Sequence, residues 1–524
     1  MKLYHHANII TMDNGRVCDA LLVDGDTIVA LGTKEEMECR KDPVFERIDL
    51  GGATVLPGFI DTHSHITQLA ASLRFVSLRE CRSFSQIADT LRTYKVQNGI
   101  PDDAWIVGFG YDHNQLDEHR HPNRWELDAV FATNPILISH LSGHMGCVNS
   151  AALAATGITA DTVDPEGGRI GRDETGVPNG YLEENAFMAL SGVIPAPTRQ
   201  EQLQLLDRAQ QIYAGLGVTT AQEGLMRQEE YDLLRDAADA GRLFLDVVGY
   251  ADIRSSAKLA EEHAGSTYAG RFRVGGYKLF LDGSPQGRTA WMATPYTKDA
   301  EQPETYRGYP IYTDKTVEEY VKKAASDGLQ LLTHANGDAA IDQLLNAHKA
   351  PSKTRNVIIH AQLMRQDQLL RVKTLGLIPS YFAAHTYYWG DTHIKNFGME
   401  RAEKISPLAA TKNLGIPFTL HQDTPVLPPN MLDTLWCAVT RKTKSDVVLG
   451  AEEVIDVTTA LQAITVNAAY QYFEEHSKGT LEVGKLADMA VLDRNPFWEP
   501  VEALRSIRVL ETIKAGKTVY RQKR

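Results

Sequence analysis

The sequence predicts an α/β protein in which eight parallel strands alternate with helices to form a (β/α)8 barrel. Between residues 53 and 474, short apolar segments that are each followed by a helical pattern recur eight times. Such apolar strands are typical of a parallel sheet that is buried on both faces. Both ends of the chain show short strands separated by turns instead. We therefore expect a barrel in the middle and a small β-domain built from the two ends.

The two ends carry hairpin signals. Residues 20–32 hold two apolar runs around an Asp-Gly turn, residues 486–493 read as a strand, and residues 513–520 read as a strand, a turn and a second strand. An isolated hairpin is only marginally stable in water, so the ends are expected to pair with each other. The prediction is a β-sandwich domain formed by residues 1–52 and 475–524.

The barrel is predicted over residues 53–474, with its strands at 58–61, 217–221, 243–248, 277–281, 329–333, 356–360, 377–381 and 417–421. About 150 residues separate the first strand from the second, whereas a barrel needs only a few tens. Residues 70–205 are therefore predicted to be an inserted subdomain, with strands of its own at 105–110 and 135–140. Long insertions after barrel strands usually shape the substrate site.

Composition limits the choice of partners and compartment. The chain has 524 residues, of which 43% are hydrophobic, and a net charge of −13 without a basic tract. That charge argues against nucleic acid and anionic membranes as partners. The five cysteines are far apart and form no CxxC pair, which favours a reducing, cytoplasmic setting. No secretory signal and no apolar run of about 18 residues is found.

Two histidines directly follow the first predicted barrel strand. His63 and His65 alternate with Ser64, so on an extended backbone their side chains project to the same side. Imidazole is the commonest protein ligand for zinc and similar ions. An HxH motif by itself is weak evidence, because incidental surface pairs are as common.

Further metal-binding side chains stand at the ends of other predicted strands. His334 ends the fifth strand, His360 ends the sixth, and Asp423 follows the eighth. Active sites of such barrels form at the carboxyl ends of the strands. Lys278 lies inside an apolar strand, where burial lowers its pKa and makes the neutral amine available to add carbon dioxide. The resulting carbamate would be an anionic ligand able to bridge two cations; the alternative is a lysine that reaches past the strand to solvent.

These segments resemble the amidohydrolase superfamily, and within it the amidohydrolase-3 (YtcJ-like) branch. The resemblance covers nearly the whole chain in family order, and the segments that carry it include Leu56-Pro-Gly-Phe-Ile-Asp-Thr-His-Ser-His, Gly217-Val-Thr-Thr, Lys278-Leu-Phe-Leu-Asp-Gly-Ser, His334-Ala-Asn-Gly-Asp-Ala-Ala, Ile359-His-Ala-Gln-Leu, Asp423-Thr-Pro-Val and Gly484-Lys-Leu-Ala-Asp-Met-Ala-Val-Leu-Asp. Two positions depart from the family pattern: Ala339 stands where the family often has arginine, and Gln422 precedes Asp423 where the family has serine.

The resemblance implies a distorted TIM barrel with two divalent ions per chain, zinc foremost, at the strand ends. It places His63 and His65 on the more buried ion, a carboxylated Lys278 between the ions, His334 and His360 on the second ion, and Asp423 on the first ion as the proton shuttle. A mononuclear site stays open as an alternative. The family also carries a histidine that matches His144 and an acidic residue that matches Glu184, and His385 follows the seventh predicted strand. A contact with substrate is the hypothesis for each of the three, and a surface or structural role is the alternative. A homodimer is expected from the resemblance alone.

The predicted function is hydrolysis of an amide-like, non-peptide C–N bond in a small molecule by metal-activated hydroxide. Asp423 would accept the proton of the water and pass it to the leaving nitrogen. Two alternatives stay open, because a fold does not fix a reaction. One is a metal-dependent deaminase, esterase or non-hydrolytic enzyme on the same site. The other is a non-catalytic barrel used for binding or regulation.

Overall fold

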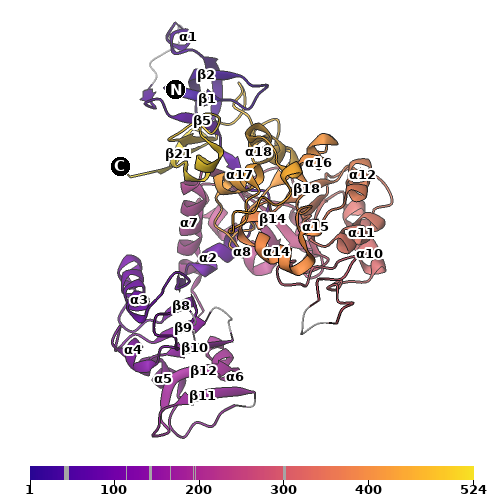
Figure 1. Ribbon diagram of the computed structural model, residues 1–524. Helices are drawn as coiled ribbons and strands as arrows, with labels where there is room; N and C mark the ends of the chain where they lie inside the picture. Colours follow the sequence, from indigo (N-terminus) through magenta and orange to yellow (C-terminus); the bar gives the residue numbers. More distant parts are fainter. Residues whose placement is uncertain are drawn as a thin grey trace. The chain divides into compact units, whose positions relative to one another are not determined.

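The computed structural model of the protein describes residues 1–39, 46–113, 115–140, 144–165, 167–192, 194, 196–298 and 303–523 (Figure 1). The chain divides into two compact units, of which one comprises residues 1–69 and 206–524 and the other residues 70–205. Each unit has sheets and hydrophobic clusters of its own. No helix in the described part of the chain is long and apolar enough to span a bilayer.

The larger unit contains an eight-stranded parallel sheet in the order β19-β18-β17-β16-β15-β14-β13-β6. All eight predicted barrel strands are confirmed, with bounds that differ by a few residues. The strands are β6 (Phe59–Ile60), β13 (Val218–Met226), β14 (Asp246–Asp252), β15 (Phe272–Phe280), β16 (Gln330–Ala335), β17 (Val357–His360), β18 (Ile378–Tyr381) and β19 (Thr419–Leu420). Most of their side chains are buried, as expected for strands covered on both faces.

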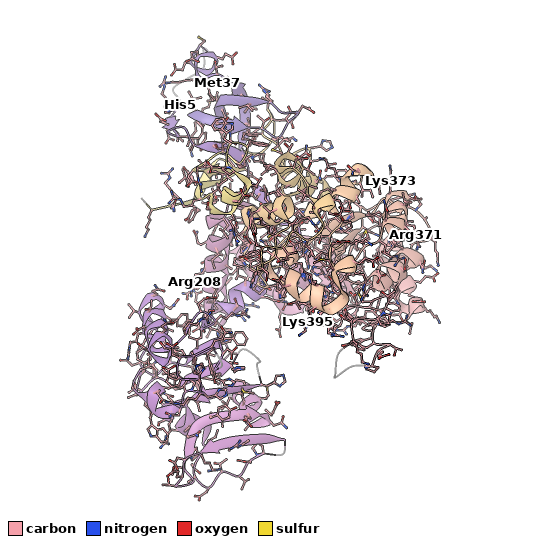
Figure 2. The ribbon with its side chains drawn as sticks, in the orientation of Figure 1. His5, Met37, Arg208, Arg371, Lys373 and Lys395 are labelled. Atoms are coloured by element: carbon pink, nitrogen blue, oxygen red, sulfur yellow. The ribbon has the colours of Figure 1, made fainter. Side chains whose placement is uncertain are left out.

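Helices follow the strands and cover the outside of this sheet (Figure 1). They are α7 (Arg199–Gly215), α8 (Gln228–Asp239), α9 (Ala257–His263), α10 (Asp314–Asp327), α11 (Asp338–Ala347), α12 (Gln366–Leu375), α13 (His385–Tyr388), α14 (Gly390–Phe397), α15 (Met399–Ala402), α16 (Leu408–Asn413), α17 (Met431–Thr440), α18 (Val457–Ala463) and α19 (Val466–Gln471). On α12, Leu369 and Val372 are buried, while Arg371 and Lys373 lie on the outer side (Figure 2). This division of apolar and charged faces is what an amphipathic outer helix requires.

Hydrogen bonds join the first and last strands of the sheet. The Thr62 hydroxyl, just after β6, donates to the carbonyl of Leu420 on β19 at 3.1 Å. A little further on, the Asp423 amide donates to the His63 carbonyl at 3.2 Å and the His65 amide donates to the Thr424 carbonyl at 2.8 Å. The segments that follow β6 and β19 are therefore held side by side, which closes the sheet into a distorted barrel.

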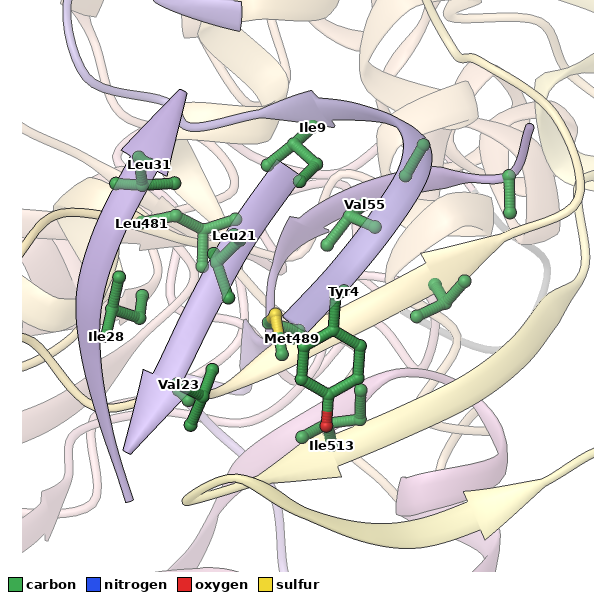
Figure 3. Close-up of a cluster of buried hydrophobic side chains, with 14 residues drawn as sticks. Tyr4, Ile9, Leu21, Val23, Ile28, Leu31, Val55, Leu481, Met489 and Ile513 are labelled. Carbon is green, nitrogen blue, oxygen red and sulfur yellow. The ribbon is translucent and has the colours of Figure 1, made fainter. Parts of the chain in front are cut away.

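The two ends of the chain share a second eight-stranded sheet, ordered β22-β21-β20-β5-β1-β2-β3 with β4 beside β1. Its strands are β1 (Lys2–Ile10), β2 (Val17–Asp24), β3 (Thr27–Gly32), β4 (Glu46–Asp49), β5 (Thr54–Pro57), β20 (Met489–Leu492), β21 (Val509–Lys514) and β22 (Lys517–Arg521). The ends meet where β5 pairs antiparallel with β20, with Val55 opposite Val491. One face of this sheet carries a core that includes Tyr4, Leu21 and Met489 (Figure 3).

Residues 70–205 form the smaller unit, which lies in the chain between β6 and β13. Its six-stranded sheet runs β11-β12-β10-β9-β8-β7, with parallel pairing from β7 to β9 and antiparallel pairing from β9 to β11. The strands are β7 (Phe75–Ser77), β8 (Ile106–Tyr111), β9 (Ile136–His140), β10 (Met145–Val148), β11 (Gly168–Arg172) and β12 (Pro178–Glu184). The helices that accompany them are α3 (Phe84–Asn98), α4 (Arg124–Asp128), α5 (Ser150–Thr156) and α6 (Asn185–Met188).

A buried ionic cluster ties the terminal sheet to the barrel at the amino-terminal end of β14. The carboxylate of Asp246, the first residue of β14, lies 2.6 Å from the ammonium groups of both Lys514 and Lys478. Lys514 belongs to β21 of the terminal sheet and also contacts Asp488 at 2.6 Å. Burial alone would raise the pKa of Asp246, but the two lysines hold it well below its usual range. The cluster therefore stabilises the fold as long as Asp246 is ionised.

We expect Asp246→Asn to lower the free energy of unfolding by about 3–5 kcal/mol, because it leaves two buried ammonium groups short of a counter-charge. The native contribution is present above the unfolded carboxyl pKa of about 4 and is lost as the pH falls toward the lower folded pKa. The variant should therefore lose less stability on acidification than the parent chain does.

Urea unfolding at several pH values measures both effects. Asp239→Asn is the matched control, since Asp239 forms an exposed i,i+4 pair with Arg235 that is worth only about 0.3–0.5 kcal/mol. Equal stability of the two variants at neutral pH would contradict the structural role of the cluster.

Candidate metal centre at the strand ends

Six predicted metal-binding residues come from five strands of the barrel or from the residues that follow them. His63 and His65 follow β6, Lys278 lies on β15, His334 on β16, His360 ends β17, and Asp423 follows β19. Parallel strands end at the same rim of a barrel, so side chains at these positions can meet although they are far apart in the sequence.

The carboxylate of Asp423 is the centre of this group. Its Oδ1 lies 3.4 Å from His63 Nε2 and 3.5 Å from His65 Nε2, and its Oδ2 lies 3.9 Å from His360 Nε2. One donor atom each from His63, His360 and Asp423 lies within 4.8 Å of the other two. Ligands bonded to one tetrahedral zinc ion at about 2.0–2.1 Å stand roughly 3.3 Å apart. The residues therefore fit a divalent transition-metal ion.

Lys278 is fully buried among these side chains, with its Nζ 3.1 Å from His63 Nε2. Burial lowers the pKa of Lys278 to about 7 and lowers the pKa of His63 and His360 well below the usual imidazole range. Both imidazoles are then neutral at neutral pH, and a substantial fraction of the Lys278 amine is deprotonated. Neutral imidazole is the form that binds metal, and a neutral amine is a nucleophile.

His65 and Asp423 behave differently because they face each other. Burial alone would lower the pKa of His65, but the carboxylates of Asp423 and Glu223 raise it to about 9. Burial alone would raise the pKa of Asp423, but His65 above all holds it below its usual range. The proton on His65 and a divalent cation compete for this anionic position, so metal binding here would release a proton.

A row of polar side chains behind the group fixes the histidine rings. Gln222 Oε1 lies 2.7 Å from His63 Nδ1, Glu223 Oε1 lies 3.5 Å from His65 Nδ1, and His421 Nε2 lies 3.1 Å from His360 Nδ1. None of these three was a predicted site residue. Gln222 and Glu223 could have been found, because they are polar residues that directly follow the predicted strand at 217–221. His421 stands two residues before Asp423 and could have been found as well.

His334 lies beside His360, with their ring centroids 4.5 Å apart. Its Nε2 lies 3.2 Å from the carbonyl oxygen of Gly283 and 3.1 Å from Asn336 Nδ2. Burial lowers the pKa of His334 to about 4, so it too is neutral. The structure thus brings all six predicted metal-binding residues to one rim of the barrel.

Two of these residues have unusual backbone conformations. His360 has a φ of 72° and Asp423 a φ of 54°. The left-handed region is uncommon for residues other than glycine, and it concentrates at functional sites where the surroundings compensate for the strain. Space around His63 is also limited, since a Cβ on Gly224 would come within 2.6 Å of its Cε1. The local fold therefore accepts backbone strain at His360 and Asp423, and the orientation of their side chains is fixed by it.

The three predicted substrate-contact residues lie in two places. His385 is buried at the start of α13, with its ring 4.7 Å from that of Phe382, which in turn lies 5.3 Å from the His421 ring. The Phe382 ring also lies 6.1 Å from the ring of His360, so it lies between His385 and that candidate ligand. His144 and Glu184 belong to the smaller unit, where both are exposed and His144 Nδ1 lies 3.1 Å from Glu184 Oε2. The substrate contacts of all three stay predictions.

A parallel barrel that gathers imidazoles, a carboxylate and a buried lysine at its strand ends is an arrangement that can hold a divalent cation. Residues 46–520 match the sequence profile of the Amidohydrolase family, and the chain belongs to that family. This agrees with the resemblance found from the motifs.

Relatives match over essentially the whole length. N-substituted formamide deformylase of Arthrobacter pascens is 28% identical over 98% of this chain and 97% of its own. YtcJ of Bacillus subtilis (strain 168), an amidohydrolase by name, is 26% identical over 99% of both chains. The crystal structure of an uncharacterized metal-dependent hydrolase from Pyrococcus horikoshii OT3 superposes with a TM-score of 0.75 and 26% identity, covering 96% of this chain and 99% of that one.

We expect Gln222→Leu to weaken metal binding at this rim by about 10- to 100-fold, because His63 loses the partner that fixes its ring. Competition with a chromophoric chelator measures the affinity. Gln228→Leu, at an exposed position of α8, should bind metal as the parent chain does. Equal affinities for the two variants would show that Gln222 does not position His63.

Proposed function

We propose that the protein is a metal-dependent hydrolase that cleaves an amide-like, non-peptide C–N bond of a small molecule. The observation that carries this proposal is the convergence of His63, His65 and His360 around Asp423 at the strand ends, with Lys278 beside His63. A whole-length relative that acts on N-substituted formamides supports the choice of bond. N-formyl and N-acyl amines are therefore the first substrates to try, followed by cyclic amides.

Two divalent ions, with zinc foremost, are part of the proposal. His63, His65 and Asp423 would hold the first ion, and His334 and His360 the second. The neutral amine of Lys278 would attack carbon dioxide, so that an N–C bond forms and one proton leaves. The carbamate would carry one negative charge shared by its two oxygens, which would reduce the electrostatic repulsion between two ions held here. Imidazole, carboxylate and carbamate ligands suit zinc and also other first-row ions.

The acid–base step is assigned to Asp423. A divalent ion held at this rim supplies a water of lowered pKa and polarises a substrate carbonyl. Asp423 is ionised, because its pKa is held below the usual range, and it can therefore accept a proton from the attacking water. Its carboxyl then returns that proton to the leaving nitrogen. His421 keeps the His360 ring in place during the cycle through the contact between Nε2 and Nδ1.

Other reactions on the same site are distinguished by substrate. A deaminase would release ammonia from an amino-substituted ring, an esterase would prefer an oxygen leaving group, and a non-hydrolytic enzyme would consume no water. A panel with matched formamide, amide, ester and aminated-ring substrates separates these outcomes. A non-catalytic barrel would turn over none of them.

We place the protein in the cytoplasm, in keeping with five cysteines that are all free.

We expect the double variant His63→Ala/His360→Ala to hold about two fewer ions per chain than the parent, because it removes one ligand of each ion. Elemental analysis of protein purified without chelator gives the difference. In the presence of 13C-labelled bicarbonate, the parent chain should show a carbamate carbon signal by NMR, and Lys278→Met should not. A difference of about one ion with no carbamate signal would establish a mononuclear site.

We expect Asp423→Asn to lower kcat by about 10²- to 10⁴-fold, because the amide cannot accept the proton. The amide oxygen can still bind metal, so the metal content should stay close to that of the parent. Asp446→Asn is the matched control, since Asp446 also has a positive φ, of 62°, and its side chain is exposed. Near-normal turnover by Asp423→Asn would remove its role as proton shuttle.

A further inference from the structure

The smaller unit contains a second group of imidazoles and a carboxylate. Asp112 and His113 follow the last residue of β8, and His140 is the last residue of β9, the neighbouring parallel strand. Tyr111 at the end of β8 lies opposite His140 in the strand register. Donor atoms from these three side chains lie within 4.8 Å of one another. Two adjacent parallel strands thus bring polar side chains together at their carboxyl ends, as five strands do in the barrel.

Three distances define the geometry of this group. His113 Nδ1 lies 3.3 Å from His140 Nε2, while Asp112 Oδ1 lies 3.6 Å from His140 Nε2 and 4.0 Å from His113 Nδ1. The two carboxylate distances are longer than a good N–H···O hydrogen bond. A circle through three points with these separations has a radius of about 2.1 Å, which is the bond length from zinc to imidazole nitrogen or carboxylate oxygen. An ion centred among the three donor atoms would therefore lie at bonding distance from each of them.

Neighbouring side chains hold these groups in place. Asp112 uses its other oxygen, Oδ2, to accept a hydrogen bond from Gln115 Nε2 at 3.0 Å. The His113 ring stacks on the His121 ring with centroids 4.0 Å apart, and His121 Nδ1 lies 2.9 Å from the hydroxyl of the buried Tyr111. Outer contacts of this kind orient ligands in protein metal sites.

We propose that Asp112, His113 and His140 form a divalent transition-metal site in the smaller unit that shares no ligand with the barrel site. Two imidazoles and one carboxylate suit zinc and neighbouring ions such as cobalt and nickel. The three side chains are between 12% and 29% exposed, so solvent can reach the ion and complete its coordination. The ion ties the loop that follows β8 to the end of β9 and stabilises this edge of the unit.

Zinc is the probe, and the test uses the full chain in the His63→Ala/His360→Ala background, where the barrel site is disabled. After zinc loading and gel filtration, this background should retain about one zinc ion per chain. Adding His113→Ala and His140→Ala should bring the content to near zero. The matched control is His119→Asn in the same loop, where His119 is exposed and has a φ of 49° that asparagine tolerates. Equal zinc content with and without His113 and His140 overturns the proposal.

A second measurement needs no substitution. Zinc should protect His113 and His140 of the parent chain from modification by diethyl pyrocarbonate, mapped by mass spectrometry, and should leave His119 reactive. Reactivity of His113 and His140 that zinc does not change also overturns the proposal. The result is independent of the proposed function, because His113→Ala/His140→Ala with an intact barrel site should keep its barrel ions and its turnover.

Discussion

The common direction of the barrel strands is the constraint on which the site depends. Lys278, His360 and Asp423 come from strands that are far apart in the sequence, and they meet only because parallel strands end at one rim. Burial at that rim removes water from the amine and the imidazoles, which lowers the pKa of Lys278 to about 7 and that of His334 to about 4. The same geometry thus gathers the candidate ligands and favours the neutral form of Lys278 and His334, whereas His65 keeps its proton beside Asp423.

Strain and support are balanced around these ligands. His360 and Asp423 adopt left-handed backbone conformations that cost free energy. Gln222 and His421 hold the rings of His63 and His360 from behind, and the hydrogen bond from the Asp423 amide to the His63 carbonyl fixes the first strand end against the last. A site organised in this way needs little reorganisation to bind an ion, which is the condition for stabilising charge that develops during a reaction.

The two ends of the barrel serve different purposes. The carboxyl ends of the strands carry the candidate metal ligands, whereas the amino-terminal end of β14 carries the Asp246 cluster with Lys514 and Lys478. That cluster attaches the terminal sheet to the barrel by buried charge pairs, so stability and chemistry are sited on different residues. In the smaller unit, polar side chains also gather at the carboxyl ends of parallel strands, since His140 ends β9 and Asp112 follows the adjacent β8.

The sequence by itself determined the eight barrel strands, the β-rich ends and the six metal-binding candidates, because apolar runs and strand-end histidines are local patterns. It also indicated a lowered pKa for Lys278, because a lysine that is buried in an apolar strand loses its hydration. Only the tertiary structure decided that Gln222 supports His63, that His421 supports His360, and that Asp112 lies beside His140. Those contacts depend on strand register and on the closure of the sheet. Neither is a local property of the chain, because both are set by the packing of residues that are distant in sequence.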